Sequence, residues 1–265
     1  MYDRFNRRIH YLRLSVTDLC NLRCTYCMPA EGVPLVRHDQ ILSFEEIAEL
    51  ARVAVELGVD KVRVTGGEPL VRRDIIELVR MLAAIPGIAD FGMTTNGVLL
   101  ARHAVALREA GLHRVNISLD TMDPARFQTI TRCGRLEDTL AGIDAALAAG
   151  FRKVKLNCVV AVSPDEPDAR SVARYAAQRN LEVRFIRKMD TVSGQFWRVV
   201  GGDGGHCQSC SRLRVSSLGR IYPCLFSDLY YDVRQLGPRA AILAAVEGKP
   251  EAGRTSENRF HHIGG

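Results

Sequence analysis

The chain has 265 residues, of which 47% are hydrophobic and 25% charged, as in globular proteins with a sizeable apolar core. Its net charge is +6, and the basic residues are scattered, which disfavours a nucleic-acid partner but suits a small polyanion. No apolar run is long enough to cross a bilayer, and residues 1–16 lack a signal-peptide core. We therefore expect a cytoplasmic protein without a membrane partner, whose eight cysteines suit metal binding better than disulfides.

Residues 1–190 alternate short strand-like runs with longer segments of helical periodicity. The expected strands are 11–17, 61–65, 91–95, 114–119, 153–160 and 182–189, and the expected helices are 43–58, 73–85, 99–111, 136–150 and 168–180. Ser43 and Glu46 have the spacing of a capping box that begins the first helix, and Gly58 is placed to end it. Six strands alternating with five helices predict an α/β fold of parallel β/α units, open or barrel-like.

This alternation stops near Asp190. The following segment is rich in glycine and has no helical period, so we divide the chain into a domain of residues 1–190 and a smaller one of 191–265. Residues 213–226 predict two strands around a Leu-Gly-Arg turn. A helix over about 233–246 and a polar tail ending in Gly264 and Gly265 complete the chain.

Residues along a strand alternate between the two faces of a sheet, and helices must cover the apolar face. The opposite, inner face then receives five cations, Arg13, Lys61, Arg63, Lys153 and Lys155, with Ser15, Thr17, Thr65, Asn116, Ser118, Asp120 and Asn157. Burying so many unpaired cations is costly, so the pattern predicts a wet, positively charged cavity for a polyanion. The alternative for any single lysine at a strand end is that it reaches solvent.

Cys20, Cys24 and Cys27 follow the first strand at its carboxyl end, the edge at which β/α folds place active sites. A structural zinc ion takes four ligands, but the next cysteine along the chain is the distant Cys133. Three thiolates instead suit a [4Fe–4S] cluster that leaves one iron open to a ligand.

The CxxxCxxC spacing, with Tyr26 before the last cysteine, resembles the cluster motif of the radical S-adenosylmethionine (SAM) superfamily. Residues 66–70, GGEPL, resemble the motif with which that superfamily meets the amino group of SAM. Within it, LRLSVTDLCNLRCTYCMP, KVRVTGGEPLVRRD, TTNG, RVNISLD, KVKLNCVV, VRFI, CQSCSRLRVSSLGRIYPCLF and the terminal IGG resemble the GTP 3′,8-cyclase family. The likeness covers residues 1–190 almost continuously and most of 206–265, and it implies a partial (β/α)6 barrel with a small carboxyl-terminal iron–sulfur domain.

Cys207, Cys210 and Cys224 form a second set of three cysteines, which again suits a [4Fe–4S] cluster with one open iron. The alternative is a zinc ribbon completed by His206, which is badly placed beside Cys207. Cys133 and Cys158 are interpreted as small buried side chains without a chemical role.

The resemblance implies conversion of GTP to 3′,8-cyclo-7,8-dihydro-GTP in molybdenum cofactor biosynthesis. The cluster on Cys20, Cys24 and Cys27 would bind SAM and cleave it reductively, and the resulting 5′-deoxyadenosyl radical would take the 3′ hydrogen of GTP. The second cluster would hold guanine. The positions matching SAM contacts are Tyr26, Gly66, Gly67, Glu68, Ser118 and Met189. Those matching GTP contacts are Arg13, Lys61, Arg63, Thr94, Lys155, Arg212 and Arg214, of which the last three are also assigned catalytic roles with the first cysteine set.

The resemblance also implies an electron donor of reductase or flavodoxin type, leaves a homodimer open, and places Gly264 and Gly265 in the active site. The chain departs from the family between Met189 and Cys207, where several tens of residues are missing. We therefore expect a loosely placed second domain and an open cavity wall. Two alternatives are another radical SAM enzyme with a second cluster, such as a peptide maturase, and a non-catalytic iron–sulfur or zinc protein.

Overall fold

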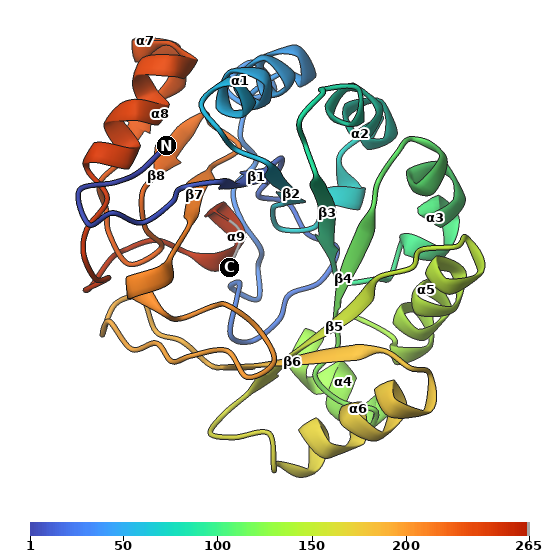
Figure 1. Cartoon of the computed structure of the whole chain (residues 1–265). Coiled ribbons are helices and arrows are strands. Elements are labelled where there is room, and N and C mark those ends of the chain that lie inside the picture. Colours follow the sequence, from blue (N-terminus) through green and yellow to red (C-terminus); the bar gives the residue numbers. More distant parts are fainter. Residues whose placement is uncertain (264–265) are drawn as a thin grey trace.

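The computed structural model of the protein describes residues 1–263. Its nine-stranded sheet, in the order β6-β5-β4-β3-β2-β1-β7-β8-β9, curves around a central space and carries helices on its outer side (Figure 1). The strands are β1 Tyr11–Ser15, β2 Lys61–Thr65, β3 Asp90–Thr95, β4 Arg114–Ser118, β5 Val154–Val160, β6 Glu182–Arg187, β7 Arg212–Val215, β8 Arg220–Tyr222 and β9 Tyr231–Asp232. Because β6 and β9 form the two edges, the predicted partial barrel is confirmed.

The helices include all five that the periodicity predicted. They are α1 Phe44–Glu56, α2 Ile75–Ala83, α3 Leu100–Glu109, α4 Pro124–Thr131, α5 Leu136–Ala148, α6 Pro167–Gln178, α7 Val233–Leu236, α8 Pro238–Glu247 and α9 Phe260–Ile263, with one-turn 3-10 helices at Pro69–Val71 and Cys207–Ser209. Helix α4 was not predicted, because Phe127 and Thr131 alone are buried along it. The single helix expected over 233–246 is wrong: Gly237, at φ +76°, separates α7 from α8, and Pro238 begins the second helix. Among residues 1–263, none of these helices combines the length and the apolar character that a bilayer span requires.

Helix α1 begins as its capping box predicts. The Glu46 amide donates to Ser43 Oγ at 3.1 Å, and the Ser43 amide donates to Glu46 Oε2 at 2.7 Å. The chain leaves the helix through Gly58, whose φ of +98° lies in the left-handed region. These contacts place the apolar face of α1, including Ile47 and Leu50, on the sheet.

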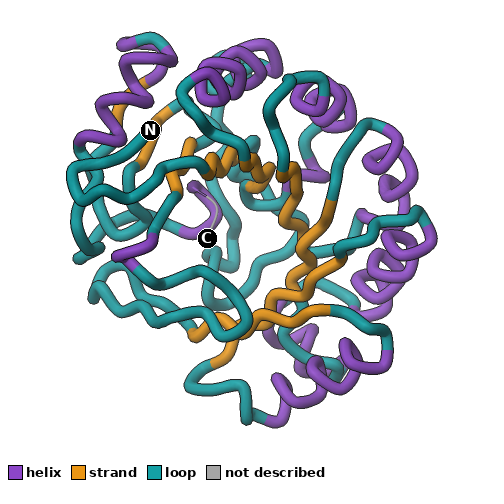
Figure 2. The backbone as a smooth tube through the Cα atoms, viewed as in Figure 1, coloured by secondary structure: helices purple, strands orange, loops and turns teal. Residues whose placement is uncertain are grey.

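The main core lies between the sheet and the outer helices, a layering that the backbone tube shows as strands inside a ring of helices (Figure 2). Alternate residues such as Leu12, Val62 and Ile117 are fully buried there. Their neighbours Arg13 and Arg63 point to the inner side, where they line a cavity. The predicted division of the strands into an apolar and a polar face is therefore confirmed at these positions.

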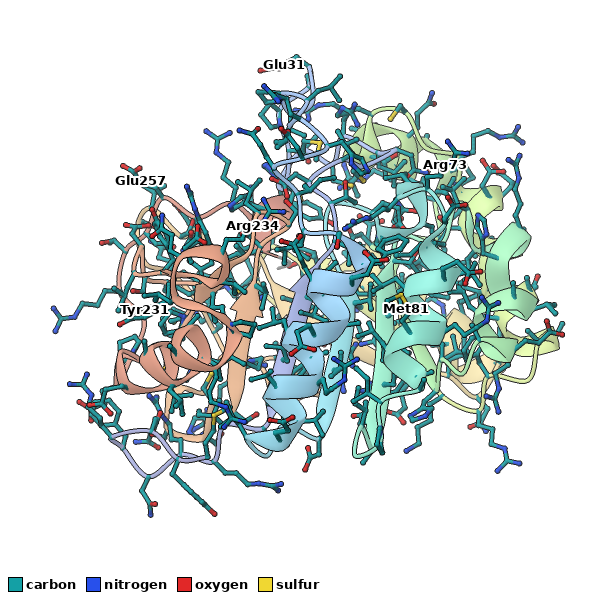
Figure 3. All side chains as sticks on the ribbon, turned by 90° about the horizontal axis from the view of Figure 1, so that it is seen from above. Glu31, Arg73, Met81, Tyr231, Arg234 and Glu257 are labelled. Atoms are coloured by element: carbon teal, nitrogen blue, oxygen red, sulfur yellow. The ribbon has the colours of Figure 1, made fainter. Side chains whose placement is uncertain are left out.

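The chain beyond residue 190 joins the same sheet. Strand β7 pairs in parallel with β1, with Arg13 opposite Arg214, and β8 folds back on β7 as predicted. Arg234 on α7 donates to Glu46 at 2.8 Å and to the Ile41 carbonyl at 3.0 Å, which ties the last helices to the start of α1 (Figure 3). A second, smaller apolar cluster consists of Tyr222, Leu225, Phe226 and Ile263. The domain division at Asp190 stays a prediction.

Candidate active site

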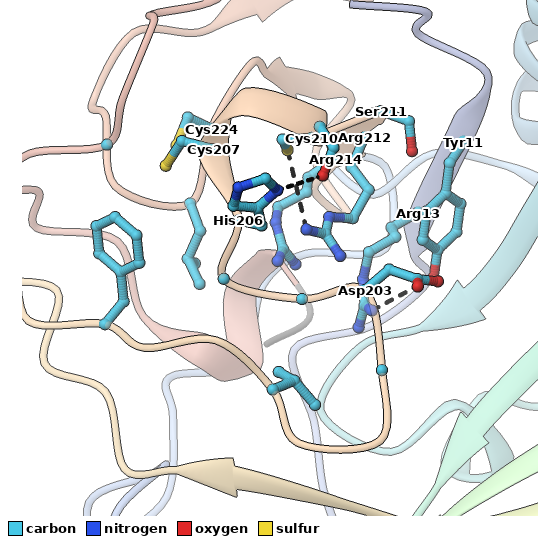
Figure 4. A pocket seen from close by; sticks show the side chains of 18 of the residues that line it. Tyr11, Arg13, Asp203, His206, Cys207, Cys210, Ser211, Arg212, Arg214 and Cys224 are labelled. Atoms are coloured by element: carbon cyan, nitrogen blue, oxygen red, sulfur yellow. Dashed lines mark hydrogen bonds between the residues drawn. The ribbon is translucent and has the colours of Figure 1, made fainter.

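A cavity of about 670 Å³ lies inside the curve of the sheet, between the inner-face residues and the second cysteine set (Figure 4). Its lining includes the cationic side chains of Arg7, Arg8, Arg13, Lys61, Arg63, Arg184, Arg212 and Arg214, together with one carboxylate, Asp203. Burial and neighbouring cations lower the pKa of Arg63 to about 10 and that of Arg214 to about 9. The positively charged cavity that strand alternation predicted is therefore present, and an anion would relieve its internal repulsion.

Polar atoms on this lining are left without partners. Within the described residues, Arg63 Nε, Asn116 Oδ1, Asn157 Oδ1 and Arg184 Nε are buried and make no hydrogen bond. Buried polar groups in native proteins are nearly always paired. Because these four include both donors and acceptors, the lining fits a ligand that offers both.

The predicted substrate residues are not all brought together. Thr94 lines the cavity, and Lys61 lines it with its Nζ 3.3 Å from Asp90 Oδ2. Lys155 lies outside the cavity lining and forms an ion pair with Glu182, directly opposite it on β6. Lys153 precedes the first residue of β5, is exposed and is not among the cavity-lining residues, so it reaches solvent, the alternative left open for a lysine at a strand end.

Tyr11 at the start of β1 is a cavity residue that our sequence analysis missed, although it has the same strand parity as Arg13. Lys61 Nζ lies 4.9 Å from its ring centroid, and Arg13 Nη1 donates to its hydroxyl at 3.5 Å. Burial raises the pKa of the phenol, but the surrounding cations, Arg13, Arg63, Arg212 and Lys61, together lower it to about 7. Arg184 on β6 was missed too, and the same alternation rule applied to Val183 and Phe185 finds it.

The second cysteine set borders the same cavity. Cys207 and Cys210 flank a single 3-10 turn, in which the Cys210 amide donates to the Cys207 carbonyl at 3.1 Å, and Cys224 approaches from the end of β8. Burial raises the pKa of the Cys210 thiol, but Lys249 and Arg212 lower it to about 6. The His206 ring is hydrogen-bonded to Ser209 Oγ at 2.7 Å (Figure 4).

The first cysteine set occupies the loop after β1. The amides of Cys27 and Met28 both donate to the Cys24 carbonyl, which folds the loop into a tight turn. Burial raises the pKa of Cys20 to about 11 and that of Cys27 to about 12, and it raises the pKa of Cys24 as well. Cys27 and Cys20 also contribute to the raised pKa of Cys24, and Cys20 contributes to that of Cys27.

All eight cysteines are free thiols, and within residues 1–263 no three Cys, His, Asp or Glu side chains gather as ligands of one ion. The assignment of each set to a cluster stays a prediction. A [4Fe–4S] cluster binds each thiolate at a different iron, so its ligands stand farther apart than those of one zinc ion. Cys158 is buried as expected, whereas Cys133 is exposed, because it lies in the turn after α4.

The GGE residues hold the first cysteine loop in place. The Gly67 amide donates to the Thr17 carbonyl at 2.7 Å, and the Glu68 amide donates to the Leu19 carbonyl at 2.8 Å. A Cβ on Gly67 would lie 2.4 Å from the Leu19 carbonyl oxygen, and one on Gly66 equally close to that of Thr17. Only glycine permits this approach. Glu68 itself is fully buried, and burial raises its pKa to about 7 although three donors bond its carboxylate.

The other predicted cofactor residues occupy two places. Tyr26 and Ser118 line a small second cavity beside the first cysteine loop, where the Tyr26 hydroxyl donates to Asp120 Oδ2 at 2.6 Å. Burial raises the pKa of Asp120 to about 6. Met189 instead lines the large cavity and packs against the smaller apolar cluster.

The last described residues lie between the first cysteine loop and β7. His261 Nδ1 lies 3.0 Å from the Cys27 carbonyl oxygen, and His262 Nδ1 lies 2.7 Å from Asp18 Oδ2. On the opposite side, Arg214 Nη1 donates to the Ile263 carbonyl at 3.4 Å. Our sequence analysis did not single out these histidines. Gly264 and Gly265, predicted to reach the active site, lie outside the described residues.

The short segment 190–206 forms a wall of the large cavity. Val200 pairs with Phe185 on β6 through two 3.0 Å backbone hydrogen bonds, and the Arg187 guanidinium lies 3.8 Å from the Trp197 ring centroid. Phe196, Val199 and residues 202–206 face the cavity. The expectation of an open wall on this side is therefore wrong, because edge pairing on β6 holds the segment in place.

Comparison with known proteins agrees with this architecture. The family model described as the Radical SAM superfamily matches residues 14–171. A GTP 3′,8-cyclase of Moorella thermoacetica is 40% identical over 311 positions, covering 99% of this chain and 95% of the relative, and one of Geobacter sulfurreducens is 42% identical, covering 88% and 86%. The first alignment spans 46 positions more than the 265 residues of this chain, so this relative carries residues that the chain lacks.

Two solved structures share the fold at low identity. Streptococcus suis SuiB bound to S-adenosylmethionine superposes with a TM-score of 0.63 at 15% identity, covering 92% of this chain and 64% of that one. Native anSMEcpe with bound AdoMet gives a TM-score of 0.61 at 15% identity, covering 91% and 81%. At these identities the likeness is one of fold alone.

Proposed function

Because this chain belongs to the GTP 3′,8-cyclase family of the radical SAM superfamily, we propose that it converts GTP to 3′,8-cyclo-7,8-dihydro-GTP in molybdenum cofactor biosynthesis. The observation that carries the proposal is a cation-lined cavity of about 670 Å³ bordered by three cysteines of the second set. The first set lies at the carboxyl end of β1 in the same fold. The enzyme uses SAM and two [4Fe–4S] clusters as cofactors.

The two cysteine sets would hold two clusters, one at the SAM end of the site and one at the guanine end. Cys20, Cys24 and Cys27 would hold the first cluster. Tyr26 and Ser118, at positions that match the family's SAM contacts, line the small cavity beside them. Cys207, Cys210 and Cys224 would hold the second cluster at the guanine end. When bound, the clusters supply the electron that cleaves SAM and an open iron that holds the base.

The triphosphate belongs among the cations of β1, β2 and β7. Arg13, Arg63 and Arg214 lie on three adjacent strands in register, so their side chains converge on one region of the cavity. Fixed guanidinium groups match a triphosphate in charge and donor geometry. Arg212 and Arg214 would also act at the reacting end, whereas Lys155 could do so only after leaving Glu182.

The segment 190–206 would exclude water from the reacting ribose, although it is shorter than in the family. Phe196 and Val199 present apolar side chains to the cavity on that side. A dry site protects a carbon radical from competing hydrogen donors. We also propose an external one-electron donor of reductase or flavodoxin type and a cytoplasmic location, where GTP and reduced thiols coexist; the homodimer stays a prediction.

The test is an anaerobic assay of the iron-reconstituted protein with SAM, a reductant and GTP, with products identified by mass spectrometry. The proposal expects 5′-deoxyadenosine and cyclised GTP in equal amounts. Formation of 5′-deoxyadenosine with unchanged GTP would contradict the substrate assignment and favour the other radical SAM reading, such as a peptide maturase. An iron-loaded protein without SAM cleavage would contradict radical SAM activity altogether.

A further inference from the structure

Two buried cations contact the backbone of the segments that carry the second cysteine set. Lys249 follows α8 and is 2% exposed, and Arg7 precedes β1 and is 6% exposed. Neither residue has a part in the substrate or cofactor roles described above. Lysine and arginine are rarely buried to this degree unless each donor is satisfied.

Lys249 bonds both chain segments that carry the cysteines. Its Nζ donates to the Arg212 carbonyl at 2.8 Å and to the Pro223 carbonyl at 2.5 Å. Arg212 stands two residues after Cys210, and Pro223 immediately precedes Cys224. One ammonium group therefore fixes the backbone on both sides of the gap that a cluster would bridge.

Arg7 fixes the remaining cysteine. Its Nη1 donates to the Cys207 carbonyl at 2.9 Å and to the Glu251 carbonyl at 2.8 Å, and its Nη2 donates to the Pro250 carbonyl at 2.7 Å. The last two acceptors directly follow Lys249 in the chain, so the two cations support one another's position. The buried carboxylate of Asp3, 2.6 Å from Arg7 Nε, holds the guanidinium itself in place.

We propose that Arg7 and Lys249 form a carbonyl clasp, a pair of positioning residues that hold the backbone at all three cysteines of the second cluster and stabilise its reduced form. The inference rests on the proposed function in assigning a cluster to these cysteines. A cluster on three thiolates is anionic and gains a further negative charge on reduction. Two fixed positive charges that are themselves buried beside the cluster favour that reduced state.

The experiment uses the full chain with Cys20, Cys24 and Cys27 changed to alanine, so that all bound iron belongs to the second set. Lys249→Met removes both charge and donors, and Lys249→Gln keeps a donor without charge. Lys153→Met, at an exposed lysine outside this cavity lining, is the matched control. Iron release to a chelator and the reduction potential of the cluster, from electron paramagnetic resonance titration, are measured for each.

The clasp predicts iron release about tenfold faster in Lys249→Met, the cost of losing hydrogen bonds from a charged donor. Lys249→Gln should retain part of that stability, and both variants should have a more negative potential than Lys153→Met. Parent-like release and potential in Lys249→Met would overturn the inference. Faster release with an unchanged potential would overturn its electrostatic half.

A variant that fails to fold does not end the test, because Arg7→Lys makes a milder change at the other half of the clasp. It keeps the charge but cannot reach three carbonyls, so it should release iron faster without the full shift in potential. Parent-like iron release in Arg7→Lys would contradict a clasp at Cys207. Failure of the proposed function can be told apart from failure of the clasp. In that case the protein with all cysteines intact would form no cyclised GTP, while the Lys249 variants would still change iron release and the potential of the second cluster.

Discussion

The two cysteine sets offer the same three thiolates in opposite electrostatic surroundings. The first lies on one loop beside the buried carboxyl groups of Glu68 and Asp120, which contribute to raising the pKa values of its thiols. The second joins two distant segments beside Lys249 and Arg212, which lower the pKa of Cys210 to about 6 against the effect of burial. SAM is a sulfonium cation and GTP a polyanion, so each set has surroundings of the sign that suits its proposed ligand.

Removal of one cysteine from each set should separate the two halves of the reaction, and this is the largest effect we expect. Cys24→Ala should abolish both 5′-deoxyadenosine and cyclised GTP, because SAM cleavage depends on the first cluster. Cys210→Ala should lose cyclised GTP but keep SAM cleavage. Product analysis by mass spectrometry checks both, with Cys133→Ala, at an exposed cysteine, as the control. Equal loss of SAM cleavage in the two variants would break the comparison.

The backbone around the second cysteine set should depend on a buried ion pair for its stability. In Asp3→Asn the Arg7 guanidinium keeps its burial but loses its carboxylate, whose side chain is fully buried. We expect the free energy of unfolding to fall by about 3–5 kcal/mol. Urea denaturation of the metal-free protein, followed by circular dichroism, measures it.

The control for this prediction is Asp39→Asn, which breaks an ion pair with Arg37 whose side chains are 61% and 78% exposed. Exposed pairs contribute at most about 1 kcal/mol. If the two substitutions changed stability equally, buried charge would not be what holds the second site together.

The loop of the first cysteine set should instead depend on close backbone packing for its position. In Gly67→Ala the new methyl group would lie 2.4 Å from the Leu19 carbonyl oxygen and push the cysteine loop outward. We expect a loss of about 1–3 kcal/mol in the free energy of unfolding, together with slower SAM cleavage. Gly150→Ala, with φ +79° and open space around its Cβ, should lose about 1–2 kcal/mol and leave SAM cleavage unchanged. Parent-like cleavage in Gly67→Ala would show that this packing does not position the loop.

The same contrast explains what could be predicted from the sequence. The first site is local in sequence. Cys20, Cys24 and Cys27 lie within one stretch of eight residues, and Gly66 and Gly67 directly follow the end of β2. Strand alternation placed Arg13 and Arg63 on the inner face, because a parity rule needs no knowledge of distant contacts. The partial barrel followed from the same strand and helix periods.

For the second site, the sequence predicted the three cysteine ligands but not the residues that hold them in place. Lys249 and Arg7 stand at positions without any local pattern, and their carbonyl acceptors are 26 to 244 residues away along the chain. Lys155 has the strand parity of a cavity residue, but it forms an ion pair with Glu182, its cross-strand neighbour on β6, instead of lining the cavity. The wall formed by segment 190–206 depends on the pairing of Val200 with the edge strand β6, and the glycine-rich sequence of the segment does not predict that pairing.

The smallest effect we expect concerns Tyr11, which lies among the cations of β1, β2 and β7 that would bind the triphosphate. Its pKa of about 7, below the usual 10, means that it loses its proton as pH rises through neutrality, and the phenolate then neutralises part of the cation field. GTP binding should take up a proton and weaken by about fivefold between pH 6 and pH 9, the effect of one nearby, partly screened charge. The KM for GTP, with kcat measured alongside, checks this. Tyr11→Phe keeps the ring under Lys61 but cannot ionise, so its KM should stay low across the same range; a parent-like rise in that variant would assign the pH effect to another group.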